Sequence, residues 1–102
     1  MNGWASHYIE ALQRGERVSF RPRGNSMTPR ITSGALVTCE PVTAETTVAV
    51  GDAVLCQVAG AQYLHLVTAI NENSYLIGNN HGGINGWTSR ARVYGRCVKV
   101  EP

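Results

Sequence analysis

The sequence predicts a mainly β protein with one short helix at its N-terminus. Short apolar runs that alternate with polar residues recur along the chain, and turns rich in glycine and asparagine separate them. Only residues 1–15 show the spacing of an amphipathic helix. We therefore expect an antiparallel sheet over residues 18–100, and a chain of 102 residues without a break in composition is expected to form one domain, residues 1–102.

The predicted helix carries one apolar face. Its apolar residues at helical spacing are Trp4, Tyr8, Ile9 and Leu12. Gly15 follows them and is a natural stop for a helix. Such a face covers one end of the sheet or, alternatively, binds a partner.

Six strands are expected after the helix. They are residues 18–23, 35–41, 53–58, 62–70, 74–77 and 92–100. Between the last two lies the stretch 78–86, in which four glycines and three asparagines favour positive φ angles and predict a long irregular loop. A loop of this length in so small a domain is often functional, although it can also be a tolerated surface excursion.

Charge gives limited information about partners. A net charge of +2 argues against general nucleic-acid binding, which would also show a steep dependence on salt. The arginines nonetheless crowd into residues 14–30, as a solvated rim or as a docking face for an acidic partner. The candidate binding residues are Arg21, Arg23 and Arg30.

The remaining composition predicts an intracellular protein without a bound metal. Cys39, Cys56 and Cys97 lie in apolar runs without close spacing, so we expect reduced, buried thiols and neither a disulfide framework nor a zinc site. No histidines have metal-ligand spacing, and no cofactor is expected. No apolar run is long enough to cross a bilayer, which predicts a soluble, cytoplasmic protein with no membrane partner.

One segment carries the strongest chemical signal. The run Gly24-Asn25-Ser26-Met27-Thr28-Pro29 holds a serine between a glycine turn and a proline. A serine hydroxyl is inert at neutral pH, so it acts as a nucleophile only if a base lies within hydrogen-bond distance. Alternatively, Ser26 caps a short helical turn that begins at Thr28-Pro29.

Several sequence boxes, in order, resemble the superfamily of signal peptidases and LexA-type self-cleaving repressors. Residues 24–34 resemble its nucleophile box, 51–54 its Gly-Asp strand start, 63–67 its base strand, and 78–80 with 89–95 its closing boxes. Together they cover residues 20–100, nearly the whole chain. The resemblance implies a LexA/signal-peptidase-like antiparallel β fold with one short N-terminal helix.

The resemblance also implies a peptidase with Ser26 as nucleophile and His65 as general base. Most members use lysine as the base, but the only lysine here, Lys99, lies past the base strand. Some signal peptidases carry histidine at this position. Histidine titrates near neutral pH and can accept the serine proton without strong desolvation. As an alternative, His65 is an ordinary strand residue.

The third member of such a site is an acid in most histidine-based triads. The only aspartate, Asp52, lies in the Gly-Asp turn, and the family's acid boxes hold Asn79, Asn80 and Asn85. We expect Asn79 to support His65. An asparagine orients an imidazole but does not neutralise it, so catalysis is expected to be slow.

The backbone around Ser26 is expected to supply the oxyanion hole. The Gly24-Asn25 turn sets these N–H groups, and Asn25 and Met27 are the expected contributors. The sequence thus favours a soluble serine endopeptidase that cleaves a protein substrate. The alternative is a catalytically weak or inactive peptidase-like binding module that acts on a host or regulatory protein, and by analogy the free-standing domain suggests a phage or mobile-element gene.

Overall fold

The computed structural model describes residues 3–102 and has one α-helix, one 3-10 helix (η1, Arg90–Arg92) and seven strands over that range. The α-helix is α1 (Ser6–Gln13). The strands are β1 (Val18–Phe20), β2 (Leu36–Pro41), β3 (Ala53–Val58), β4 (Ala61–Ile70), β5 (Ser74–Gly78), β6 (Ile84–Ser89) and β7 (Val93–Glu101). The predicted mainly β fold with one short helix is confirmed, and the first two residues of the predicted helical stretch lie outside the described range.

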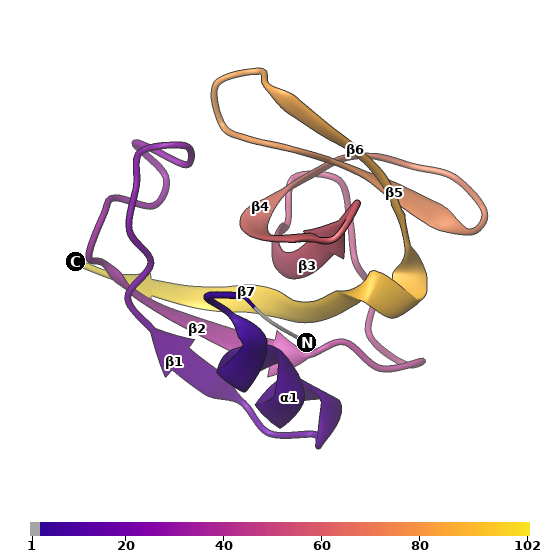
Figure 1. The fold of residues 1–102 in the computed structure, drawn as a ribbon, viewed down its shortest axis with the longest axis horizontal. Helices are drawn as coiled ribbons and strands as arrows, with labels where there is room; N and C mark the ends of the chain where they lie inside the picture. The colour runs from indigo at the N-terminus through magenta and orange to yellow at the C-terminus, as the bar shows by residue number, and fades with distance from the viewer. Residues whose placement is uncertain (1–2) are drawn as a thin grey trace.

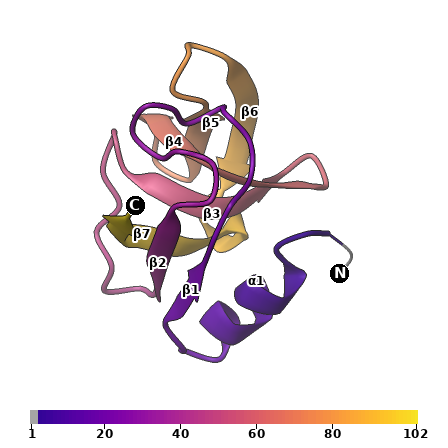
Figure 2. The ribbon, with the colours of Figure 1, turned by 90° about the vertical axis from the view of Figure 1, so that its left-hand side faces the viewer.

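All strand pairs are antiparallel and form one sheet in the order β1-β2-β7-β3-β4-β5-β6. The sheet is strongly curved, so that β1, β2 and β7 lie against α1 while β4, β5 and β6 turn away from it (Figure 1). The long connection between β1 and β2 arches across the side of the molecule toward β4 and β5 (Figure 2). This connection carries Ser26, and β4 carries His65.

Strand β3 is buried on both faces and divides the core in two. Ala53 and Leu55 join a first cluster with α1, β1 and β2, whereas Val54, Cys56 and Val58 join a second cluster with β4, β5 and β7. Alternate side chains of a strand point to opposite faces, which explains how one strand contributes five residues to the two clusters. The run of apolar residues without polar alternation is typical of such a central strand.

The buried side chain of Gln62 in β4 anchors the start of α1. Its Oε1 accepts the backbone N–H of Ala5 at 2.7 Å, and its Nε2 donates to Ser6 Oγ at 3.1 Å. Ile9 and Leu12 are buried and Tyr8 packs against the first core cluster, whereas Trp4 is half-exposed beside Phe20, with ring centroids 5.8 Å apart. No helix within residues 3–102 has the length and apolarity needed to span a bilayer.

One strand is absent from the sequence prediction. Residues 78–86 were expected to form one irregular loop, but β6 already begins at Ile84 and pairs with β5. The irregular part shrinks to residues 79–83. The glycines on both sides of Asn85 and Ile84 concealed the strand, because glycine is normally rare in strand interiors.

Candidate functional site

Ser26 and His65 meet at the junction between the β1–β2 connection and β4. Ser26 Oγ lies 2.9 Å from His65 Nε2, within hydrogen-bond distance. His65 is buried, with 8% of the residue exposed to solvent. Its ring stacks on that of Tyr63, with ring centroids 4.9 Å apart. Residues two apart on a strand share a face, so β4 itself brings the Tyr63 ring beside the imidazole.

The other ring nitrogen of His65 faces Asn85. The distance from His65 Nδ1 to Asn85 Oδ1 is 2.7 Å. An amide oxygen only accepts, so this orientation assigns the proton to Nδ1 and leaves Nε2 as the acceptor for the Ser26 hydroxyl. The neutral imidazole is thereby held in the tautomer that a general base needs.

A β-bulge directs Asn85 toward the imidazole. In the β5–β6 pair, Gly78 lies opposite Ile84 and Ile77 lies opposite Gly86, so Asn85 is the extra residue without a partner. Bulges redirect side chains and increase local twist. Gly86 has a φ of +134°, which other residues rarely adopt, and this conformation lets the strand resume after the bulge.

Two groups of contacts hold the serine segment in place. The side chain of Met27 is buried in the first core cluster, next to the serine. From the other side, Asn80 donates its backbone N–H to the carbonyl of Ser26 at 2.9 Å and its Nδ2 to the carbonyl of Thr28 at 3.0 Å. His81 Nε2 donates to the carbonyl of Asn25 at 2.9 Å. The 79–83 loop thus fixes the serine segment.

The structure corrects the expected support residue. Asn79 Oδ1 accepts the backbone N–H groups of His81 and Gly83 at 2.8 and 2.9 Å, so its side chain shapes the loop. Asn85 occupies the place beside His65 instead. Sequence reasoning placed both asparagines in the acid boxes, and only the bulge in β6 distinguishes them.

The backbone groups around Ser26 differ in whether they are free to bind an oxyanion. The carbonyl of Asn25 already accepts hydrogen bonds from Thr28 and His81. The backbone N–H groups of Asn25, Ser26 and Met27, by contrast, donate to no other group within residues 3–102. Free N–H groups next to a serine Oγ are the donors that a tetrahedral oxyanion requires.

A cleft of about 300 Å³ opens in front of Ser26 and His65. Its walls are the start of α1, the serine segment and the first half of β4. The side chains and backbone that line it belong to Trp4, Arg21, Pro22, Arg23, Gly24, Ser26, Met27, Ile31, Thr32, Gln62, Tyr63, Leu64 and His65. Trp4 was missed as a cleft residue; its Nε1 donates to the carbonyl of Gln62 at 3.1 Å, which holds the indole at the rim.

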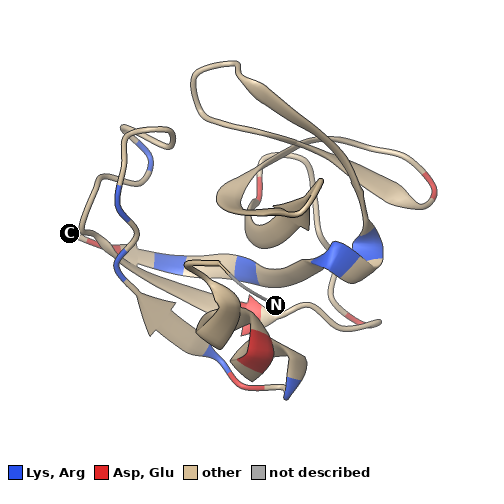
Figure 3. Cartoon of the chain, in the orientation of Figure 1, with Lys and Arg blue, Asp and Glu red and all other residues tan. Residues whose placement is uncertain are grey.

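The cleft is positively charged and has no acidic residue in its lining. Figure 3 shows basic residues, all of them arginines by sequence, and no Asp or Glu on the connection between β1 and β2. Arg21 donates to the carbonyl of Gly34 at 2.9 Å, and neither Arg21 nor Arg23 has a carboxylate within salt-bridge distance among residues 3–102. Arg30 lies outside the lining, where it donates to the carbonyl of Gly51.

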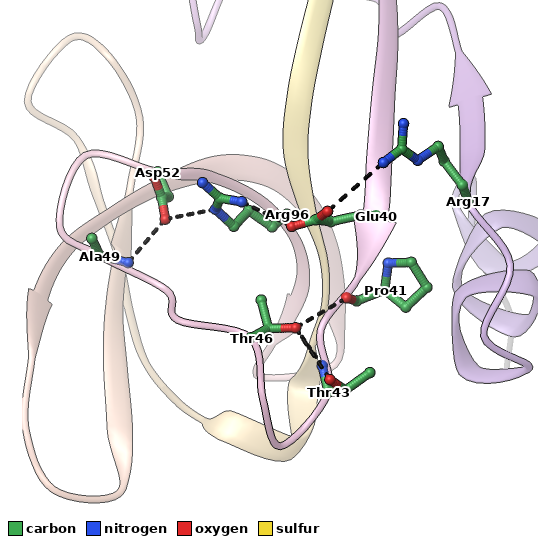
Figure 4. Close-up of polar contacts among 8 residues, drawn as sticks. All are labelled: Arg17, Glu40, Pro41, Thr43, Thr46, Ala49, Asp52 and Arg96. Atoms are coloured by element: carbon green, nitrogen blue, oxygen red, sulfur yellow. Dashed lines mark hydrogen bonds and ion pairs between the residues drawn. The ribbon is translucent and has the colours of Figure 1, made fainter.

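The only aspartate belongs to a different network. Asp52 Oδ2 accepts from Arg96 Nε at 3.2 Å and from the backbone N–H of Ala49 at 2.9 Å (Figure 4). Arg96 Nη1 also donates to Glu40 at 2.8 Å. These two hydrogen bonds, with the charges of both carboxylates, raise the pKa of Arg96. Asp52 is therefore committed to a structural ion network.

The site offers serine and imidazole chemistry without a metal cluster. Among the residues that the structure describes, no group of three or more His, Cys, Asp or Glu side chains could hold a metal ion. Comparison with family models, curated proteins and solved structures found no match to this chain. The interpretation of the site therefore depends on its own geometry.

Proposed function

We propose that the protein is a serine peptidase in which Ser26 is the nucleophile, His65 the general base and Asn85 the residue that positions the base. The observation that carries this proposal is the hydrogen-bonded chain Ser26 Oγ–His65 Nε2, 2.9 Å, and His65 Nδ1–Asn85 Oδ1, 2.7 Å. Three side chains from three separate segments meet in the order that nucleophilic catalysis requires, at the wall of a cleft.

The chemistry follows from these contacts. Ser26 Oγ attacks the carbonyl carbon of the scissile peptide bond while His65 Nε2 takes the hydroxyl proton. The free N–H groups of Ser26 and Met27 are the donors for the developing oxyanion. His65 then gives the proton to the leaving amine, and water hydrolyses the acyl ester with the same residue as base.

Asn85 sets an upper limit on the rate. An amide holds the Nδ1–H tautomer but carries no charge to stabilise the imidazolium that forms during attack. In a triad based on aspartate, exchange of the carboxylate for an amide lowers kcat by about 10⁴-fold. We therefore propose a slow peptidase, suited to few turnovers and not to bulk digestion.

The cleft supports an acidic peptide as the substrate class. Arg21 and Arg23 stand at its rim without carboxylate partners among residues 3–102, and guanidinium groups bind carboxylates in a bidentate fashion. Trp4, Met27 and Ile31 give the same cleft an apolar floor and wall. A segment with an acidic residue next to an apolar one complements both features.

Labelling with a fluorophosphonate tests the nucleophile, because this reagent needs an activated serine and no knowledge of the substrate. We expect the label on the peptide that contains Ser26, and none on Ser26→Ala. His65→Ala should slow labelling by roughly 10²- to 10⁴-fold, the range that general-base catalysis contributes. Ser89→Ala, which changes an exposed serine at the end of β6, should label normally. Equal background labelling of all four proteins would refute the nucleophile.

Peptide arrays probed with the Ser26→Ala protein test the substrate class separately from catalysis. Sequences with aspartate or glutamate should be enriched, and Arg21→Ala with Arg23→Ala should remove the enrichment. Arg92→Ala, an exposed arginine outside the cleft, is the matched control. Binding that ignores acidic residues would refute this substrate class. Arginine-dependent binding without any serine labelling would instead favour a peptidase-like binding module, because the neutral Asn85 weakens the base.

A further inference from the structure

Two of the three cysteines face each other across the centre of the sheet. Cys39 in β2 is the direct register partner of Cys97 in β7. Cys39 is fully buried in the first core cluster, and the partly buried Cys97 packs against the same cluster. The third cysteine, Cys56, lies in the second cluster on the opposite face of β3.

The register places the two cysteines opposite each other on adjacent strands. Directly opposed residues on antiparallel strands have Cα atoms about 4.5 to 5.5 Å apart. Disulfides span Cα separations of about 4.4 to 6.8 Å. A register shift between Thr38 and Cys39 marks a local bulge, and a bulge gives the strands extra twist where the two side chains meet.

The two thiols differ in character. The pKa of Cys97 is lowered to about 7, first by the adjacent Cys39 thiol and further because Arg30 and Arg96 favour the thiolate. The pKa of Cys39 is raised by the neighbouring Cys97 and by burial. One partly exposed thiolate beside one buried thiol is the arrangement of an attacking and a resolving cysteine.

We propose that Cys39 and Cys97 form a peroxide-reactive dithiol site, in which Cys97 is oxidised first and Cys39 resolves it to a disulfide between β2 and β7. The Cys97 thiolate attacks hydrogen peroxide, the O–O bond breaks, and a sulfenic acid and hydroxide form. The Cys39 sulfur then attacks the Cys97 sulfur, the S–O bond breaks, and the departing hydroxide leaves as water with the Cys39 proton. The two thiols lose two electrons and two protons, and peroxide becomes two waters.

Limited oxidation of the full chain with hydrogen peroxide tests the site, because glutamyl endopeptidase separates the three cysteines. Cuts after Glu16, Glu45 and Glu72 leave each cysteine on its own peptide, and the Glu40–Pro41 and Glu101–Pro102 bonds resist this enzyme. Mass spectrometry without reduction should find the Cys39 and Cys97 peptides joined, with loss of two hydrogen atoms from a monomeric chain. Reduction with dithiothreitol should restore both thiols.

Three variants make the result decisive. Cys56→Ser should form the same link, whereas Cys97→Ser should form none. Cys39→Ser should leave Cys97 as a sulfenic acid that dimedone traps, because the resolving thiol is gone. The proposal is overturned if the link involves Cys56, if it joins two chains, or if Cys97 is oxidised while Cys39 stays free. No oxidation of Cys97 at all would overturn it equally. None of these outcomes depends on the activity of Ser26.

Discussion

Two polar networks in this protein join distant segments of the chain, one through uncharged groups and the other through charged groups. In one, the chain Ser26–His65–Asn85 joins three groups that are uncharged when the imidazole is neutral. In the other, Arg96 bridges two carboxylates, those of Asp52 and Glu40. Both are partly shielded from water, and both connect segments that are far apart in the sequence.

The only aspartate of the chain, Asp52, belongs to the ion network and not to the Ser26–His65 site. Asp52 accepts from Arg96 and from the backbone of Ala49, so its charge closes the turn that starts β3 and ties it to β7. A cationic partner offsets part of the desolvation cost of a partly buried carboxylate. Among residues 3–102, His65 takes part in no ion pair, and the amide of Asn85 satisfies Nδ1 without adding charge. Asn85 thus orients the imidazole of His65 but does not stabilise the positive charge of an imidazolium.

The largest effect is expected from Asn85→Asp, which gives the Ser26–His65 site a carboxylate like those of the ion network and should change the rate of serine labelling. A carboxylate at Nδ1 would stabilise the imidazolium, and the rate of fluorophosphonate labelling should rise by about 10-fold or more, toward the 10⁴-fold that separates amide from carboxylate in other triads. The control is Asn79→Asp, which introduces the same charge in the 79–83 loop but away from Nδ1. An unchanged rate, or an equal gain in both variants, would contradict the role of Asn85.

A smaller effect, on stability alone, is expected from Arg96→Met. Asp52 and Glu40 are 24% and 30% exposed at their side chains; Asp52 would lose its only ion pair among residues 3–102, and Glu40 would keep only Arg17, at 3.9 Å. This case lies between exposed and buried ion pairs, so the free energy of unfolding in urea should fall by roughly 1–2 kcal/mol. Lys99→Met removes an exposed pair and should cost about 0.5 kcal/mol or less. A similar small loss in both variants would show that the ion network contributes no more than a surface pair.

The smallest effect is expected on the reactivity of the Cys97 thiol, which lies near the charge of Arg96. The positive charge of Arg96 helps to lower the pKa of Cys97 to about 7, so its removal should raise that pKa and leave less thiolate at neutral pH. Alkylation of Cys97 by iodoacetamide at pH 7 should slow about twofold in Arg96→Met. Cys56, whose pKa burial raises to about 12, is the unreactive internal reference. Faster alkylation would contradict the sign of the electrostatic effect.

Much of the fold could be predicted from local patterns. Alternating apolar residues located six of the seven strands, and glycine turns such as Gly51-Asp52 separated them. β6 was missed because the glycine run around Ile84 and Asn85 has the composition of a loop, and only pairing with β5 makes it a strand. The helix was found with its apolar face, but the contact of Gln62 with Trp4 was not, because it joins residues far apart in sequence.

The site could be predicted only in part. The meeting of Ser26 with His65 was expected from a resemblance and not from spacing, since 39 residues separate them. The choice between Asn79 and Asn85 depended on one bulge, and sequence patterns do not fix the position of a bulge. The contacts of Asn80 and His81 with the serine segment were likewise missed, because a polar loop residue gives no sign of its partner.

The tautomer of His65 tests the central claim most directly, because a base for Ser26 must have a free Nε2. Nitrogen-15 NMR of the neutral imidazole, with His65→Ala used for assignment, distinguishes a protonated Nδ1 from a protonated Nε2. We predict the Nδ1–H form, stabilised by Asn85 Oδ1, and loss of this preference in Asn85→Ala. A dominant Nε2–H form in the wild-type protein would leave Ser26 without an acceptor and would contradict the assignment of His65 as its base.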